Sequence, residues 1–97
     1  MNMKTLYELN IGQHGTVIDI TADEKIKRRL QDIGFIKGAE VLCAFKSPFG
    51  EPTAYRIKGT TIALRDEQSK NILIKYKKED ILWDWRENLL VQIYLTT

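Results

Sequence analysis

The feature that most constrains the fold is a series of short β-rich segments, separated by glycine and proline, in a chain of only 97 residues. Two prolines, Pro48 and Pro52, place residues 47–52 in a loop because neither can donate to a central ladder. Alternating or β-branched apolar residues predict strands at 16–20, 39–46, 55–58, 61–64 and 72–76. About five strands this short, in a chain with room for one domain, predict a small closed barrel or a sandwich.

One segment has the period of a helix instead of a strand. Residues 21–24 have the Thr-x-x-Glu spacing of a capping box, in which the two side chains satisfy free amide groups at a helix start. Ile26, Leu30 and Ile33 then follow at spacings of four and three, which places them on one face of a helix. The sequence therefore predicts one α-helix, over residues 22–33.

Charge and ligand chemistry exclude several classes of function. Fifteen basic and thirteen acidic residues leave a net charge of +2, which is too balanced to indicate a nucleic-acid-binding protein. A tight transition-metal site needs several converging His, Cys or carboxylate ligands, and the chain has one histidine and one cysteine. Cys43 alternates with Val41 and Phe45 on the apolar face of a strand, which favours core packing over ligation. His14 is interpreted as a solvated loop residue, so no metal site is predicted.

Catalytic and membrane signatures are also missing from the sequence. There is no phosphate-binding Gly-x-x-x-x-Gly-Lys loop and no nucleophile elbow around either serine, so we expect neither an enzyme nor a bound cofactor. The longest apolar-rich stretch, residues 81–95, is interrupted by charged side chains and is shorter than the roughly 20 residues of a spanning helix. The N-terminus lacks the apolar region of a signal peptide, and we expect a cytoplasmic protein without a membrane span.

An ordered set of residues between positions 4 and 76 resembles the FeoA family (ferrous iron transport protein A). The matching residues are Leu6 and Leu9, Gly12 and Gly15, Arg29-Leu30, Asp32-x-Gly34, Gly38, Pro48-x-Gly50-x-Pro52, Gly59, Ala63-Leu64-Arg65 and Ile72-x-Ile74. One residue departs from the family pattern, because Ser69 stands where the family usually has alanine. The resemblance implies that residues 1–76 form an SH3-like β-barrel domain.

The resemblance also implies a function and a partner. FeoA-like proteins are cytosolic accessory or regulatory adaptors of bacterial ferrous iron uptake. The implied partner is the FeoB-type permease, contacted on its cytosolic GTP-binding domain, which would bring this chain to the inner membrane. The alternative function is a metal-sensing module, because similar modules form the C-terminal part of some iron-dependent transcriptional repressors.

The shared residues themselves are mostly structural. Glycines supply backbone angles that other residues resist, and prolines stiffen the loop that contains them. The residues with this structural interpretation are Gly34, Gly38, Pro48, Gly50, Pro52 and Gly59. The functional surface must therefore be sought in other residues.

Four residues are candidates for partner binding. Arg28 and Arg29 lie with Lys25 on one side of the predicted helix, as either a solvated face or a docking patch for an acidic partner or a phosphate. Phe49, at the tip of the proline loop, either folds back onto the barrel or serves as an exposed anchor. Arg65 either fixes a turn or contributes to the same surface.

Residues 77–97 extend beyond the family pattern. Leu82, Trp85, Leu89 and Ile93 have helical spacing, whereas residues 91–95 alternate like a strand, so both interpretations stay open. So many large apolar residues are expected to be covered. We expect this C-terminal extension to pack on the barrel, with homodimerisation or partner docking through it as alternatives.

Overall fold

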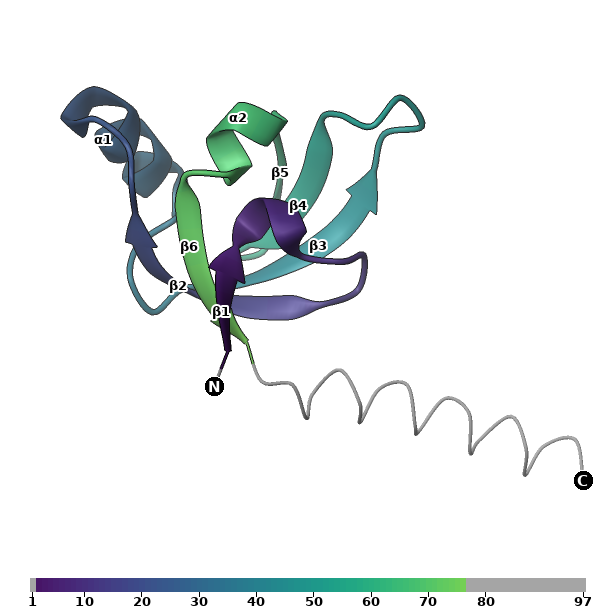
Figure 1. The fold of residues 1–97 in the computed structure, drawn as a ribbon, viewed down its shortest axis with the longest axis horizontal. Coiled ribbons are helices and arrows are strands. Elements are labelled where there is room, and N and C mark those ends of the chain that lie inside the picture. Colours follow the sequence, from purple (N-terminus) through teal and green to yellow (C-terminus); the bar gives the residue numbers. More distant parts are fainter. Residues whose placement is uncertain (1, 77–97) are drawn as a thin grey trace, which may run out of the picture.

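Residues 2–76 form one antiparallel sheet of six short strands and a single helix of more than one turn (Figure 1). This computed structural model describes residues 2–76, so the predicted C-terminal extension at 77–97 lies outside the described residues. The strands are β1 (Asn2–Thr5), β2 (His14–Ile20), β3 (Glu40–Lys46), β4 (Thr53–Ile57), β5 (Thr60–Leu64) and β6 (Ile72–Tyr76). The helices are the 3-10 turn η1 (Leu6–Glu8), α1 (Glu24–Ile33) and the single turn α2 (Asp66–Ser69).

The strand order is β1-β6-β2-β3-β4-β5, and every neighbouring pair is antiparallel. The ribbon of the sheet is strongly curved (Figure 1). The five predicted strands and the mainly β fold are confirmed. The buried core contains Leu6, Leu9, Val17, Ile20, Leu30, Phe35, Val41, Cys43, Tyr55, Ile57, Leu64, Ile72 and Ile74.

The sixth strand, β1, was missed by the sequence analysis. Its residues, Asn-Met-Lys-Thr, have neither the apolar alternation nor the β-branched content that marks a strand. It forms because β6 offers an edge, with Asn2 opposite Tyr76 and Thr5 opposite Leu73. A strand whose stability depends on its partner carries little signal of its own.

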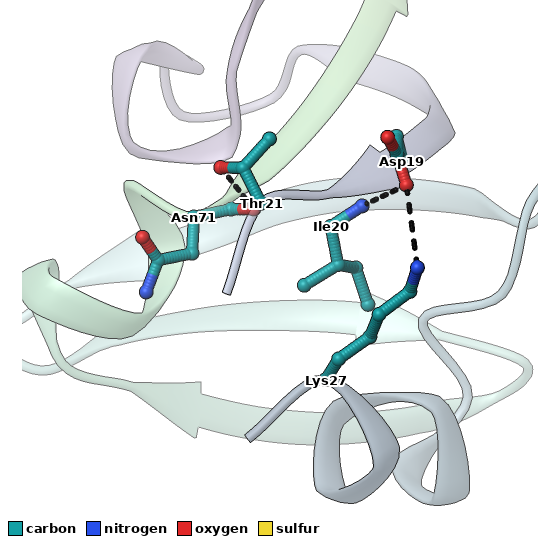
Figure 2. A network of polar contacts seen from close by, with 5 residues as sticks. All are labelled: Asp19, Ile20, Thr21, Lys27 and Asn71. Atoms are coloured by element: carbon teal, nitrogen blue, oxygen red, sulfur yellow. Dashed lines mark hydrogen bonds and ion pairs between the residues drawn. The ribbon is translucent and has the colours of Figure 1, made fainter. Parts of the chain in front are cut away.

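The helix begins two residues later than predicted. Its N-cap is Asp23, whose side chain accepts a hydrogen bond from the amide of Ile26 at 3.0 Å. Thr21, the expected cap, instead donates through its hydroxyl to the carbonyl oxygen of Asn71 at 3.2 Å, as Figure 2 shows. The predicted capping box was therefore wrong, because Thr21 is engaged by the turn before β6. Gly34 is the C-cap with φ 134°, as expected.

A β-bulge corrects the predicted face of one aromatic side chain. Cys43 is opposite Tyr55 but Phe45 is opposite Ala54, so the register shifts between Cys43 and Phe45. The extra residue turns Phe45 outward, and 58% of it is exposed. The prediction that Phe45 shares the apolar face of Cys43 was therefore wrong, although Val41 and Cys43 are buried as expected.

Candidate functional site

The loop between β3 and β4 presents an aromatic side chain on a braced turn. The amide of Ser47 donates to the carbonyl oxygen of Pro52 at 3.1 Å, and the amide of Gly50 donates to that of Ser47 at 2.9 Å. The Ser47 hydroxyl accepts from the amide of Phe49 at 3.3 Å. Phe49 is 93% exposed, so it does not fold back onto the barrel.

A second exposed aromatic residue belongs to the same hairpin. Phe45 is turned outward by the bulge at the end of β3, close in sequence to the turn that carries Phe49. We call Phe45 and Phe49 the hairpin surface. Exposed aromatic side chains on a rigid element are the usual anchors of protein interfaces. Sequence reasoning had found Phe49 but not Phe45, because the bulge leaves no local signal.

Helix α1 is held to the barrel by little buried surface. Leu30 is its buried residue, whereas Ile26 and Ile33 are 38% and 43% exposed. At 100° per residue, these two isoleucines lie between Leu30 and Arg29 around the helix. We call Ile26, Arg29 and Ile33 the helix surface. Three side chains predicted on one apolar face therefore divide into a single anchor and two partly exposed neighbours.

The charges on α1 are arranged unequally around it. Lys27 lies on the flank toward β2, where its Nζ is 3.8 Å from Oδ1 of Asp19 (Figure 2). Lys25, Arg28 and Arg29 are exposed on the other side, as predicted. Two carboxylates, Glu24 and Asp32, are exposed on the same helix and reduce its net positive charge. The exposed Lys27–Asp19 pair contributes roughly 0–1 kcal/mol to stability.

Arg65 stands on a different element from the other arginines. It is the N-cap of α2, which is separate from α1 in Figure 1 but meets the β3–β4 loop, where the amide of Asp66 donates to the carboxylate of Glu51 at 3.5 Å. Its amide donates to the side-chain oxygen of Gln68 at 3.0 Å, and its carbonyl oxygen accepts from the amide of Gln68 at 3.0 Å. The backbone of Arg65 thus fixes the turn, and its exposed side chain lies outside the helix and hairpin surfaces.

A polar cluster where β1, β6 and the start of β2 meet was not anticipated. Lys4 donates from Nζ to Oε1 of Gln13 at 3.0 Å and lies 4.3 Å from the centre of the Tyr76 ring. Burial lowers the pKa of Lys4, and a neighbouring carboxylate, Glu8, opposes that shift. Gln13 is buried, and its Nε2 has no hydrogen-bond partner among the described residues. A glutamine in a polar loop gives no sequence sign of such burial.

The predicted structural glycines have the backbone angles that justify them. Gly50 and Gly59 have φ of 97° and 77°, and Gly38 has φ of 91°. These values lie in the left-handed region that favours glycine. Pro48 and Pro52 flank the turn that carries Phe49, as predicted.

Metal-ligating side chains do not converge in the described part of the chain. Within residues 2–76, no group of three or more His, Cys, Asp or Glu side chains could hold an ion. Cys43 is buried, and burial raises the pKa of its thiol, which keeps it protonated and unreactive. His14 is exposed, but it begins β2 and does not lie in the loop predicted for it.

Comparison with known proteins identifies the family. The model of the FeoA domain matches residues 4–76, which is most of the chain. The chain belongs to the FeoA family. FeoA proteins are non-enzymatic accessory factors of ferrous iron transport, and this membership gives the general role of the chain. No curated protein matches at a significant level.

Two solved structures show how similar other FeoA proteins are. An FeoA-like protein from Clostridium acetobutylicum is 32% identical, with a TM-score of 0.72, over 78% of this chain and 88% of that one. FeoA from Stenotrophomonas maltophilia, crystallised with zinc and described as a prokaryotic SH3 domain protein, is 35% identical, with a TM-score of 0.66. That match covers 73% of this chain and 88% of the other. The fold of this FeoA chain is therefore the predicted SH3-like one.

A third structure shares the fold alone. A manganese-dependent transcriptional repressor in complex with manganese has a TM-score of 0.71 at 21% identity, over 79% of this chain and 38% of the repressor. Function does not transfer at this level of similarity.

In residues 2–76 of this FeoA chain, no helix has the length and apolar character needed to cross a membrane.

Proposed function

We propose that this FeoA chain is a cytoplasmic adaptor that binds the cytosolic GTP-binding domain of a FeoB-type ferrous iron permease, which holds it at the inner membrane. Family membership supports the transport role. The observation that carries the proposal is the almost complete exposure of Phe49 on a turn braced by three hydrogen bonds. A large aromatic side chain held in solvent on an ordered turn is available to be buried against a partner.

The energetics of a rigid anchor favour this mode of binding. Burying a Phe side chain against a partner contributes about 1.5–3 kcal/mol. The turn is already ordered by its own hydrogen bonds, so little conformational entropy is lost when Phe49 docks. Arg28 and Arg29 would act differently, by attracting an acidic partner surface and raising the association rate. Arg65 lies on a third element and would contribute least.

The test is calorimetric titration of the full chain with the purified GTP-binding domain of its own organism's permease, with and without GTP. We expect saturable binding that weakens about tenfold or more in Phe49→Ala, since a loss of 1.4 kcal/mol is tenfold in Kd. The matched control is Met3→Ala, which removes an exposed apolar side chain of β1. In the strand order, β1 is at one end of the sheet, and β4 and β5 are at the other. Equal affinity for both variants would reject Phe49 as the anchor.

The alternative, a metal-sensing module, is tested on the same samples. One observation favours it, because the Stenotrophomonas maltophilia FeoA was crystallised in complex with zinc. Tight metal binding needs converging ligands, and residues 2–76 contain no such group. Titration of the full chain with Zn(II), Fe(II) and Mn(II) should therefore give no saturable heat. Stoichiometric binding of one of these ions, together with no binding to the permease domain, would favour the sensor.

A further inference from the structure

The helix surface lacks a cover within the described part of the chain. Ile26 and Ile33 are each about two-fifths exposed, and they lie seven residues apart, roughly 10 Å along the helix. Leu30 alone of the residues of α1 is buried. Two adjacent, half-exposed isoleucines on a helix so lightly attached indicate that another apolar segment packs beside them.

The surroundings of the two isoleucines are mainly cationic. Arg29 and Lys25 adjoin them on the side of the helix away from Lys27. Lys58, in the β4–β5 turn, lies at the C-terminal end of the helix, because a Cβ built on Gly34 would be 3.6 Å from Cδ of Lys58. Asp32 is the carboxylate closest to this side in the helical projection. A segment that covers the isoleucines should therefore be both apolar and acidic.

A segment with this composition follows in the same chain. Residues 79–97 contain four carboxylates and one guanidinium. The carboxylates are Glu79, Asp80, Asp84 and Glu87, and the guanidinium is Arg86. The same stretch is rich in large apolar side chains, including Leu82, Trp83, Trp85, Leu89, Leu90 and Ile93. Its charge and its apolar content both complement the helix surface.

The covalent connection is long enough. Ile20 is the last residue of β2, and the chain runs from it to α1. Ile72, the first residue of β6, is paired with Ile20, and β6 ends at Tyr76. Tyr76 is therefore about one strand length, roughly 13 Å, from the end of the sheet at which α1 begins. Residues 77–80 can span roughly 13 Å when extended, and the seventeen residues from 81 to 97 remain for contact.

We propose that residues 79–97 dock on the helix surface of the same molecule, cover Ile26 and Ile33, and place their carboxylates against Arg29, Lys25 and Lys58. This goes beyond the proposed adaptor role, since it concerns contacts within one chain. The hairpin surface would stay accessible throughout.

Tryptophan fluorescence tests the proposal directly. Trp83 and Trp85 are the only tryptophans of the chain, so emission reports on this segment alone. We expect the emission of the full chain to be blue-shifted relative to a synthetic 77–97 peptide. Ile26→Asp/Ile33→Asp should move it to the peptide's wavelength while circular dichroism shows that the barrel is retained. A full chain that emits at the same wavelength as the peptide would reject the proposal.

The matched control changes another exposed apolar region, on the hairpin. Phe45→Asp introduces one negative charge on the hairpin surface, against two in the helix variant, and should leave the emission unchanged. A red shift in Phe45→Asp, with none in Ile26→Asp/Ile33→Asp, would place the segment on the hairpin and overturn the proposal. Helix α1 and the β3–β4 hairpin stand at opposite sides of the view in Figure 1, so the effects of the two variants are separable.

Charge reversal and concentration complete the test. Arg29→Glu/Lys25→Glu should shift the emission to the red, and adding Asp84→Lys/Glu87→Lys should return it toward the wild-type wavelength. If neither charge reversal changed the emission wavelength, charge would not be what directs the segment to the helix surface. Docking within one molecule also predicts a concentration-independent spectrum and a monomer by light scattering. A blue shift that appears only as dimers form would place the segment on a second copy and overturn the intramolecular form.

Discussion

The hairpin surface and the helix surface differ in how the fold holds them. Both strands of the hairpin are paired in the sheet, and its turn is closed by three hydrogen bonds, so Phe49 stands on a rigid support. Helix α1 is attached through one buried residue, Leu30, and an exposed ion pair from Lys27. One small barrel can therefore present a fixed apolar anchor on one side and a weakly attached, charged helix on the other.

The chemistry of the two surfaces differs as well. The hairpin surface is aromatic, whereas the isoleucines of the helix surface adjoin cations. Apolar contact depends weakly on salt, but contact that involves exposed arginine and lysine is screened at physiological ionic strength. Binding through the hairpin should therefore persist in high salt, and binding through the helix should not.

The largest expected effect on stability comes from removing the side chain that attaches α1 to the barrel. Leu30→Ala should lower the free energy of unfolding by about 2–5 kcal/mol, because it deletes the buried anchor of α1 and leaves a cavity. Ile26→Ala, at a residue that is 38% exposed, is the matched control and should cost less. Urea denaturation measures both, and equal losses would contradict a single-anchor attachment.

The second effect concerns the support of the hairpin. Gly50→Ala should destabilise the protein by about 1–2 kcal/mol, because an alanine is strained at φ 97°. No atom lies within 4 Å of the added Cβ, so the cost is conformational and not steric. Thermal unfolding measures it, with Ser47→Ala as a companion that removes one hydrogen bond of the turn. A neutral Gly50→Ala would show that the turn is less rigid than its hydrogen bonds indicate.

The smallest expected effect on stability concerns the N-cap of α1. Asp23→Ala should cost about 1 kcal/mol, since it removes the acceptor for the amide of Ile26. Asp23→Asn, which keeps a capping oxygen, should cost less. Helical circular dichroism together with urea denaturation distinguishes the two variants. If both were neutral, the helix start would not depend on this cap.

Much of the fold followed from local patterns. Strands with apolar alternation, such as 72–76, and the helix with its Gly34 cap were predictable, because periodicity and left-handed glycines are properties of a few neighbouring residues. β1 was not predictable, since its pairing with β6 supplies what its own residues lack. The same reason explains the N-cap, where Asn71, fifty positions away, engages Thr21 and leaves Asp23 as the cap.

The candidate site was less accessible to sequence reasoning than the fold. Phe49, Arg28 and Arg29 could be named as candidates because a proline loop and a helical period place them outside the core. Their exposure, and the outward turn of Phe45, required the structure, because exposure depends on what packs against a residue. A bulge reverses the strand face without any change in local composition.

The order of residue types was enough to predict the family, the mainly β architecture and the position of the helix, and it showed no catalytic motif. These follow from the order of residue types along the chain, which is local information. Only the tertiary structure decided which apolar side chains became core and which became surface. That division depends on strand register, on the bulge in β3 and on the contacts of α1, all of which join residues distant in sequence.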